Sequence, residues 1–153
     1  MGTDADPLAA SSAGAEASVA EGSAQAEKGS EGAGDAVVVQ YVVLRRDLWG
    51  EMGWPLGSVV AQACHACTAA VWGAREEACV RGYLANVDSM HKVVLEVKSE
   101  TQLRNLSNKL QEANVDHKLW VEQPENFATC LATRPYPKPE IQHHFKKLKL
   151  CKG

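Results

Sequence analysis

A run of eight residues, 37–44 (VVVQYVVL), constrains the fold more than any other segment of this 153-residue chain. It is almost continuously apolar and rich in β-branched side chains. A strand with one exposed face alternates between apolar and polar residues, whereas a strand covered on both faces does not. The run therefore predicts a central strand of an α/β fold that has helices packed on both faces of its sheet.

The segments after this strand show helical and strand patterns in turn. The loop LWGEMGWPLG has neither period, Pro55 suits the first turn of a helix, and residues 58–72 form an Ala-rich apolar helix. A more polar helix is predicted over 75–86, with Cys79, Tyr83 and Leu84 facing inward. Residues 92–97 (KVVLEV) predict the second strand, and Ser99 is a good N-cap for a helix that ends near residue 113.

Two further strands are predicted near the end of the chain, over 117–122 and 127–133, joined by the turn-forming QPEN. A last short helix follows, with Ile141, Phe145 and Leu148 as its apolar stripe. The order β-α-α-β-α-β-β-α predicts a three-layer α/β fold whose four-stranded mixed sheet is flanked by helices.

The first 36 residues differ in composition from the rest. They are almost all Ala, Gly, Ser and acids, with seven carboxylates against the single Lys28, so their net charge is −6. Such a segment buries too little apolar surface to offset the entropy of ordering it. We expect a disordered acidic tail over 1–36 and one domain over 37–153. With 15 basic and 12 acidic residues, that domain has a net charge of +3, although the whole chain has −3.

Membrane and secretory signals are missing from the pattern. No apolar run approaches the ~18 residues that span a bilayer, and the first residues do not read as a signal or transit peptide, so we expect a cytoplasmic protein without membrane contact. An odd number of cysteines then predicts reduced, mostly buried thiols; they are Cys64, Cys67, Cys79, Cys130 and Cys151.

Most catalytic motifs are excluded or weak. The chain has no G-x-S-x-G, no P-loop and no H-E-x-x-H. The pair Cys64 and Cys67 has CxxC spacing, but it lies inside a predicted helix and no second ligand pair completes a zinc site, which favours two small side chains packed in the core. His143 and His144 lie among Lys146, Lys147, Lys149 and Lys152, which suits a solvated helix face and a weak phosphate-binding edge equally.

The polar residues of the Ala-rich helix are more informative. Gln62 and His65 are three positions apart, so they project from neighbouring positions of one helix face. A polar side chain on a buried helix costs free energy unless it is paired, and near a helix end it can instead face a cleft. The alternative for His65 is an ordinary core or surface histidine whose ring nitrogens are hydrogen-bonded.

At this helix the chain resembles a known family. The segment VVAQACHA, after a strand that ends in RRDL, resembles the R-x-D-L and G-K-x-A-A-Q-C-S-H-A hallmarks of the archaeal and eukaryotic (second) family of peptidyl-tRNA hydrolases. KVVLEVKSETQLRNL and TCLATRPYP resemble its later strands and exit, so the resemblance covers residues 37–150. The combination of AQACHA with WVEQPENFATCLATRPYP resembles the divergent eukaryotic branch called peptidyl-tRNA hydrolase domain-containing protein more closely than it resembles the main enzyme of the family.

The resemblance implies hydrolysis of the ester between a peptide and the terminal ribose of tRNA. It further implies a mixed four-stranded sheet, often a homodimer, peptidyl-tRNA as partner, and neither a metal nor an organic cofactor. The chemistry needs a positioned water, a proton acceptor and donors for the oxyanion.

Only about half of the site residues that the resemblance implies have a matching residue in this sequence. Gln62, His65 and Asp47 match catalytic positions, and Glu122 matches approximately, as the base or the group that orients it. Ser58 stands where the family has a lysine, and the family's threonine has only Asn126 and Thr129 as nearest candidates. The predicted tRNA contacts are Arg45, Arg46, Ser58, Lys92, Asn126, Thr129 and Arg134. A non-catalytic module that binds tRNA or protein, or an adaptor that acts through its acidic tail, are the alternatives to an enzyme.

Overall fold

The structure is a computed structural model that describes residues 36–153; of the tail predicted over 1–36, residues 1–35 lie outside the described residues. The strands are β1 (Val38–Arg45), β2 (His91–Val97), β3 (His117–Glu122), β4 (Phe127–Thr133), β5 (Tyr136–Pro137) and β6 (Lys149–Leu150). The helices are α1 (Asp47–Gly50), α2 (Leu56–Gly73), α3 (Ala78–Ala85), α4 (Glu100–Glu112) and α5 (Lys138–Ile141), with 3-10 turns at Val87–Ser89 and Gln142–His144.

One mixed sheet contains all of these strands, in the order β3-β4-β1-β2-β6, with β5 also paired to β1. Only β1 and β2 run parallel, with Val39 opposite His91, and the other pairs are antiparallel. The prediction of a mixed sheet flanked by helices is confirmed, and the four long strands are those predicted. The count of four was too low because β5 and β6 have two residues each, too few to show a period.

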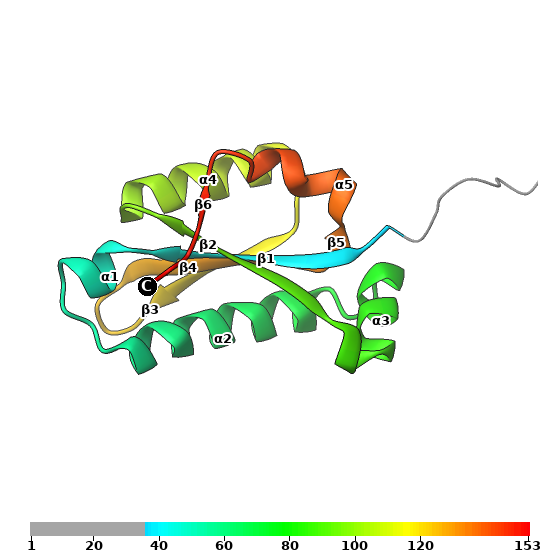
Figure 1. Ribbon diagram of the computed structural model, residues 1–153, viewed down its shortest axis with the longest axis horizontal. Coiled ribbons are helices and arrows are strands. Elements are labelled where there is room, and N and C mark those ends of the chain that lie inside the picture. Colours follow the sequence, from blue (N-terminus) through cyan, green and yellow to red (C-terminus); the bar gives the residue numbers. More distant parts are fainter. Residues whose placement is uncertain (1–35) are drawn as a thin grey trace, which may run out of the picture. The chain divides into compact units, whose positions relative to one another are not determined.

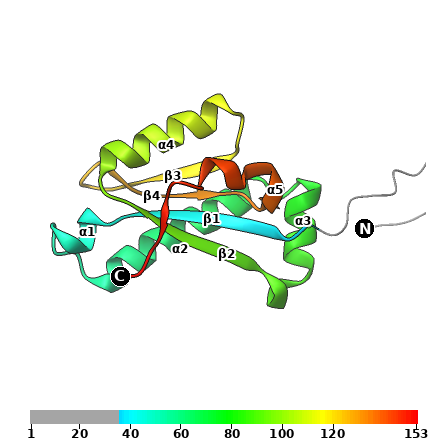
Figure 2. The same cartoon turned by 45° about the horizontal axis from the view of Figure 1, so that its top comes forward.

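Helices cover both faces of the sheet (Figures 1 and 2). The longest helix, α2, lies along one face, while α4 and α5 lie on the other. Along β1, Val39, Tyr41 and Val43 pack toward α4, whereas Val42 and Leu44 pack toward α2. This alternation explains why the strand reads as a continuous apolar run: both faces are core.

The helix predictions hold with three corrections. Ser99 does cap α4, through a hydrogen bond from the Gln102 amide. The loop after β1 contains the one-turn α1, too short for a periodic signal. In α3 the buried residues are Val80 and Tyr83, while Leu84 is exposed. The last helix is only α5 followed by a 3-10 turn. Within residues 36–153, no helix is long and apolar enough to cross a membrane.

The five cysteines are free thiols, but the prediction that most are buried is wrong. Only Cys130, on β4, is buried, and burial raises the pKa of its thiol to about 12. Cys64 is exposed and Cys67 is half-buried, so the CxxC pair does not pack together in the core. The reason is geometric: α2 is an outer layer, and only one stripe of it faces the sheet.

Candidate active site

A cavity of about 450 Å³ opens beside the first turns of α2. Ser58, Gln62 and His65 line it from α2, where spacings of four and three residues place them on one side of the helix. Glu122 lines it from the end of β3, against which α2 packs. The structure therefore brings four of the predicted site residues together. Gly53, Trp54, Pro55, Ala61 and Glu125 complete the lining.

Gln62 lies at the edge of the cavity and is held there by two hydrogen bonds from β4. Its side chain is buried, and its Oε1 accepts a hydrogen bond from Thr129 Oγ1 at 2.9 Å. Its backbone carbonyl accepts from the Cys130 thiol. Because the amide oxygen is already occupied, the NH₂ group is the part of the side chain that remains as a donor for a molecule in the cavity.

A β-bulge makes both contacts to Gln62 possible. Trp120 pairs with Cys130, but the next residue, Val121, pairs with Ala128, so Thr129 is an extra residue on β4. In a regular strand, successive side chains point to opposite faces. The bulge lets Thr129 and Cys130 both face α2, which is a common way to redirect a side chain near a functional site.

Trp120 joins the other two predicted residues of the cavity and was missed in the sequence analysis. Its ring stacks on the His65 imidazole, with centroids 4.8 Å apart and planes at 20°. Its indole Nε1 donates a hydrogen bond to Glu122 Oε2 at 2.9 Å. Strand period was the available signal, because residues two apart share a face and Trp120 precedes Glu122 by two.

Arg45 and Asp47 form a buried ion pair at the end of β1. The Arg45 guanidinium bonds both Asp47 oxygens, Glu100 and the Ala128 carbonyl, and the residue is only 5% exposed. Burial acts to raise the pKa of Glu100, but the Ala128 N–H, Arg104 and Arg45 together hold it below its ordinary value. The phosphate contact predicted for Arg45 does not fit this location, since its donors are used inside the protein.

The other predicted tRNA contacts separate into three groups. Thr129 is fully buried and donates a hydrogen bond to Gln62, so it holds a residue of the cavity but is not itself accessible to tRNA. Arg46 and Asn126 are exposed, Arg46 beside a second cavity and Asn126 in the β3–β4 turn, where its φ of 56° suits an asparagine.

Lys92 and Arg134 lie at the end of the sheet that is far from the cavity of Gln62. Lys92 is opposite Gln40, four residues or ~13 Å along β1 from the Leu44–Cys130 pair. Its ammonium bonds the Gln40 side chain and the Tyr83 hydroxyl. Arg134 follows the opposite end of β4 and pairs with Asp116. Neither residue contributes to the cavity of Gln62.

The charge of this cavity differs from that expected for a site that binds a polyanion. Its lining includes two carboxylates, Glu122 and Glu125, and no lysine or arginine. Ser58, where the resemblance leads us to expect a lysine, is exposed at the cavity wall. Among residues 36–153, no group of three or more His, Cys, Asp or Glu is placed to hold a metal ion. The arrangement can orient and deprotonate a water, but it has no cation for phosphate.

An amide donor and a carboxylate at one cavity are groups that can assist hydrolysis of an ester, and here they are held by an α/β sheet covered on both faces. The model of the family described as "Peptidyl-tRNA hydrolase PTH2" matches residues 38–151. The chain therefore belongs to the PTH2 family of peptidyl-tRNA hydrolases.

Three relatives agree with this assignment. The chain is 51% identical over 124 residues to the human protein named "Putative peptidyl-tRNA hydrolase PTRHD1", covering 80% of this chain and 89% of that protein. It is 51% identical over 117 residues to the mouse protein of the same name, covering 76% and 84%. It is 32% identical over 120 residues to "Probable peptidyl-tRNA hydrolase 2" of Dictyostelium discoideum, covering 72% of this chain and 53% of that protein.

Proposed function

We propose that this chain hydrolyses the ester between a peptide and the terminal ribose of tRNA. One observation supports this best: Thr129 occupies the Gln62 oxygen, so the Gln62 NH₂ is left for the cavity that Glu122 also lines. A donor and a proton acceptor at one cavity are the two groups that water attack on an ester requires.

The chemistry follows from these groups. A water adds to the ester carbonyl carbon and gives its proton to Glu122, while the Gln62 NH₂ donates to the developing oxyanion. The bond between the carbonyl carbon and the ribose oxygen then breaks, and Glu122 gives its proton to the ribose oxygen. His65, stacked on Trp120, orients the water or the ester. Asp47 acts at a distance, because it holds Arg45, whose guanidinium bonds the Ala128 carbonyl next to Thr129.

The tRNA contacts that remain in this proposal are the exposed residues Arg46, Ser58 and Asn126. Lys92 lies too far from the cavity, and Arg45, Thr129 and Arg134 are committed to internal partners. A homodimer and a cytoplasmic location stay predictions.

The decisive experiment follows peptide release from labelled peptidyl-tRNA by the purified full chain at physiological salt. Gln62→Ala is expected to lower the rate by about 10²–10³, the cost of removing one oxyanion donor. Gln111→Ala is the matched control, because Gln111 is exposed on α4. Release that is undetectable in wild type, or equal in wild type and Gln62→Ala, would contradict the proposed activity.

A second function is favoured by one observation, the cavity's lack of a cation. If the loss of the family lysine at Ser58 abolishes hydrolysis, the chain is a family member that binds tRNA or a protein without cleaving it. The two functions differ in the response to a restored lysine at this position, which is predicted below.

A further inference from the structure

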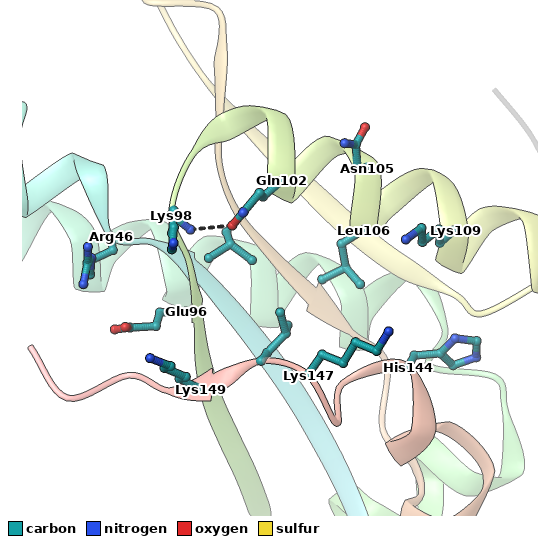
Figure 3. A pocket seen from close by; sticks show the side chains of 12 residues that line it. Arg46, Glu96, Lys98, Gln102, Asn105, Leu106, Lys109, His144, Lys147 and Lys149 are labelled. Carbon is teal, nitrogen blue, oxygen red and sulfur yellow. Dashed lines mark hydrogen bonds between the residues drawn. The ribbon is translucent and has the colours of Figure 1, made fainter.

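A basic groove lies on the face of the sheet opposite the candidate active site. It has a volume of about 460 Å³ and is formed by the end of β2, the exposed side of α4 and the C-terminal segment around β6 (Figure 3). Five cations and one carboxylate line it: Arg46, Lys98, Lys109, Lys147, Lys149 and Glu96. We call this surface the lysine groove.

The lysine groove accounts for the positive charge of the domain. Residues 37–153 have a net charge of +3, and the groove side chains alone have +4. The remaining surface therefore has a net charge of −1. All five cations are exposed, and no ion pair within residues 36–153 joins any of them to a carboxylate. Their charges are available to an anion from solution.

The arrangement of the cations indicates an extended anion. Figure 3 shows them distributed along the groove, from Arg46 beside α1 to Lys109 on α4 and Lys147 on the C-terminal segment, instead of converging on one point. Between them, Gln102 uses its Oε1 on the Lys98 amide, which leaves its NH₂ as a further donor. Lysines act as point charges on flexible stems, which suits a phosphodiester backbone contacted without regard to sequence.

The lysine groove also supplies what the candidate active site lacks. The Gln62 cavity has two carboxylates and no cation, so it cannot by itself attract a polyanion. One short segment joins the two places: Arg46 lines the groove, α1 follows, and the cavity is then lined by Gly53, Trp54, Pro55 and Ser58. The cavity and the Arg46 end of the groove both lie toward the end of the sheet where β1 and β2 finish.

We propose that the lysine groove binds the phosphodiester backbone of the tRNA whose acylated end occupies the Gln62 cavity. This inference rests on the proposed function for the position of the ester, but the groove's affinity for RNA is measured separately. The groove is thus the source of affinity, and the cavity is the source of chemistry.

The test compares two variants of the full chain that each lose two positive charges. Lys109→Gln/Lys147→Gln removes charge from the groove. Arg75→Gln/Arg81→Gln removes the same charge from exposed positions just after α2 and on α3, which Figure 1 places on the other face of the sheet from α4 and the groove. Binding of deacylated tRNA is measured from 0.05 to 0.3 M salt, and thermal melting confirms that both variants fold.

The groove variant is expected to bind tRNA about tenfold or more weakly at 0.1 M salt. The plot of log K against log salt should become less steep by about 1.5, since each lost phosphate contact contributes ~0.7–0.9 to the magnitude of its slope. The control should keep the wild-type slope. Equal losses in both variants, or no loss in the groove variant, would overturn the proposal, and the first result would indicate a general effect of net charge.

Peptide release separates this proposal from the proposed function. In the groove variant, KM for peptidyl-tRNA should rise with kcat unchanged, and release from a peptidyl-adenosine ester, which lacks the RNA backbone, should equal wild type. If wild type releases no peptide while the groove variant alone loses tRNA affinity, the proposed hydrolysis fails and the groove stands. If release depends on Gln62 but tRNA affinity does not depend on the groove, the groove fails and the hydrolysis stands.

Discussion

Thr129 and Gln62, 67 positions apart in the sequence, are joined by a hydrogen bond of 2.9 Å from the threonine hydroxyl to the amide oxygen. Thr129 is fully buried at the bulge of β4, so this hydroxyl is held by the sheet itself. The bond determines which end of the Gln62 amide is left for the cavity. Thr129 is therefore a positioning residue for the proposed reaction.

Thr129→Val removes this bond and keeps the shape of the side chain. We expect kcat for peptide release to fall about fivefold with KM unchanged, because one neutral hydrogen bond contributes ~1 kcal/mol and Gln62 becomes free to rotate its amide. Thr129→Ser retains the hydroxyl and should restore most of the rate. A valine variant with wild-type kcat would show that the bond does not orient Gln62.

Trp120→Phe keeps an aromatic ring beneath His65 but removes the indole donor to Glu122. Bonds to charged groups contribute ~1.5–3 kcal/mol, and partial exposure of Glu122 reduces this, so kcat should fall about fivefold to tenfold. The same change in a Glu122→Gln background should have little further effect, since the carboxylate is already gone. Additive losses in this double-mutant cycle would mean that Trp120 acts through His65 or through packing.

Ser58→Lys restores the charge that the family resemblance leads us to expect in the Gln62 cavity. Ser58 is exposed in the first turn of α2, so a lysine should be tolerated, at a cost of ~0.3–1 kcal/mol from the helix N-terminus. If hydrolysis was only weakened by the loss of the lysine, peptide release should exceed the wild-type rate. Release that stays at background while tRNA binding tightens would instead support the non-catalytic function. Ser58→Gln is the neutral control of similar length.

Glu100→Gln should destabilise the domain and change its response to acid. The pKa of Glu100 is lowered below its ordinary value of 4.5, so its ion pairs stabilise the fold at neutral pH. That contribution is lost as pH falls below ~4.5 and through the lowered pKa. In urea titrations, the variant should lose about 1–2 kcal/mol at pH 7, because buried Arg45 loses one carboxylate partner, and less at pH 3. Glu112→Gln, exposed on the same helix, should show neither effect.

The elements of the fold were predictable wherever local pattern is strong. The continuous run of β1 indicated burial on both faces, and Ser99 marked the start of α4 through its side-chain oxygen. The two-residue strands β5 and β6 and the one-turn α1 escaped prediction, because a period needs more residues than they contain. They form only where neighbouring segments supply partners.

The sequence by itself determined the layer order, the placement of Gln62 and His65 on one side of α2, and the resemblance that singled out Glu122. These follow from helix and strand periods and from short motifs, which are local properties of the chain. Tertiary structure alone decided that Arg45 is enclosed by Asp47 and Glu100 and that a bulge turns Thr129 toward Gln62. It also decided that Arg46 lines one groove together with lysines from three other segments. Each of these depends on strand register and on contacts between distant segments, and a shift of one residue in register would turn the same side chain to the opposite face of the sheet.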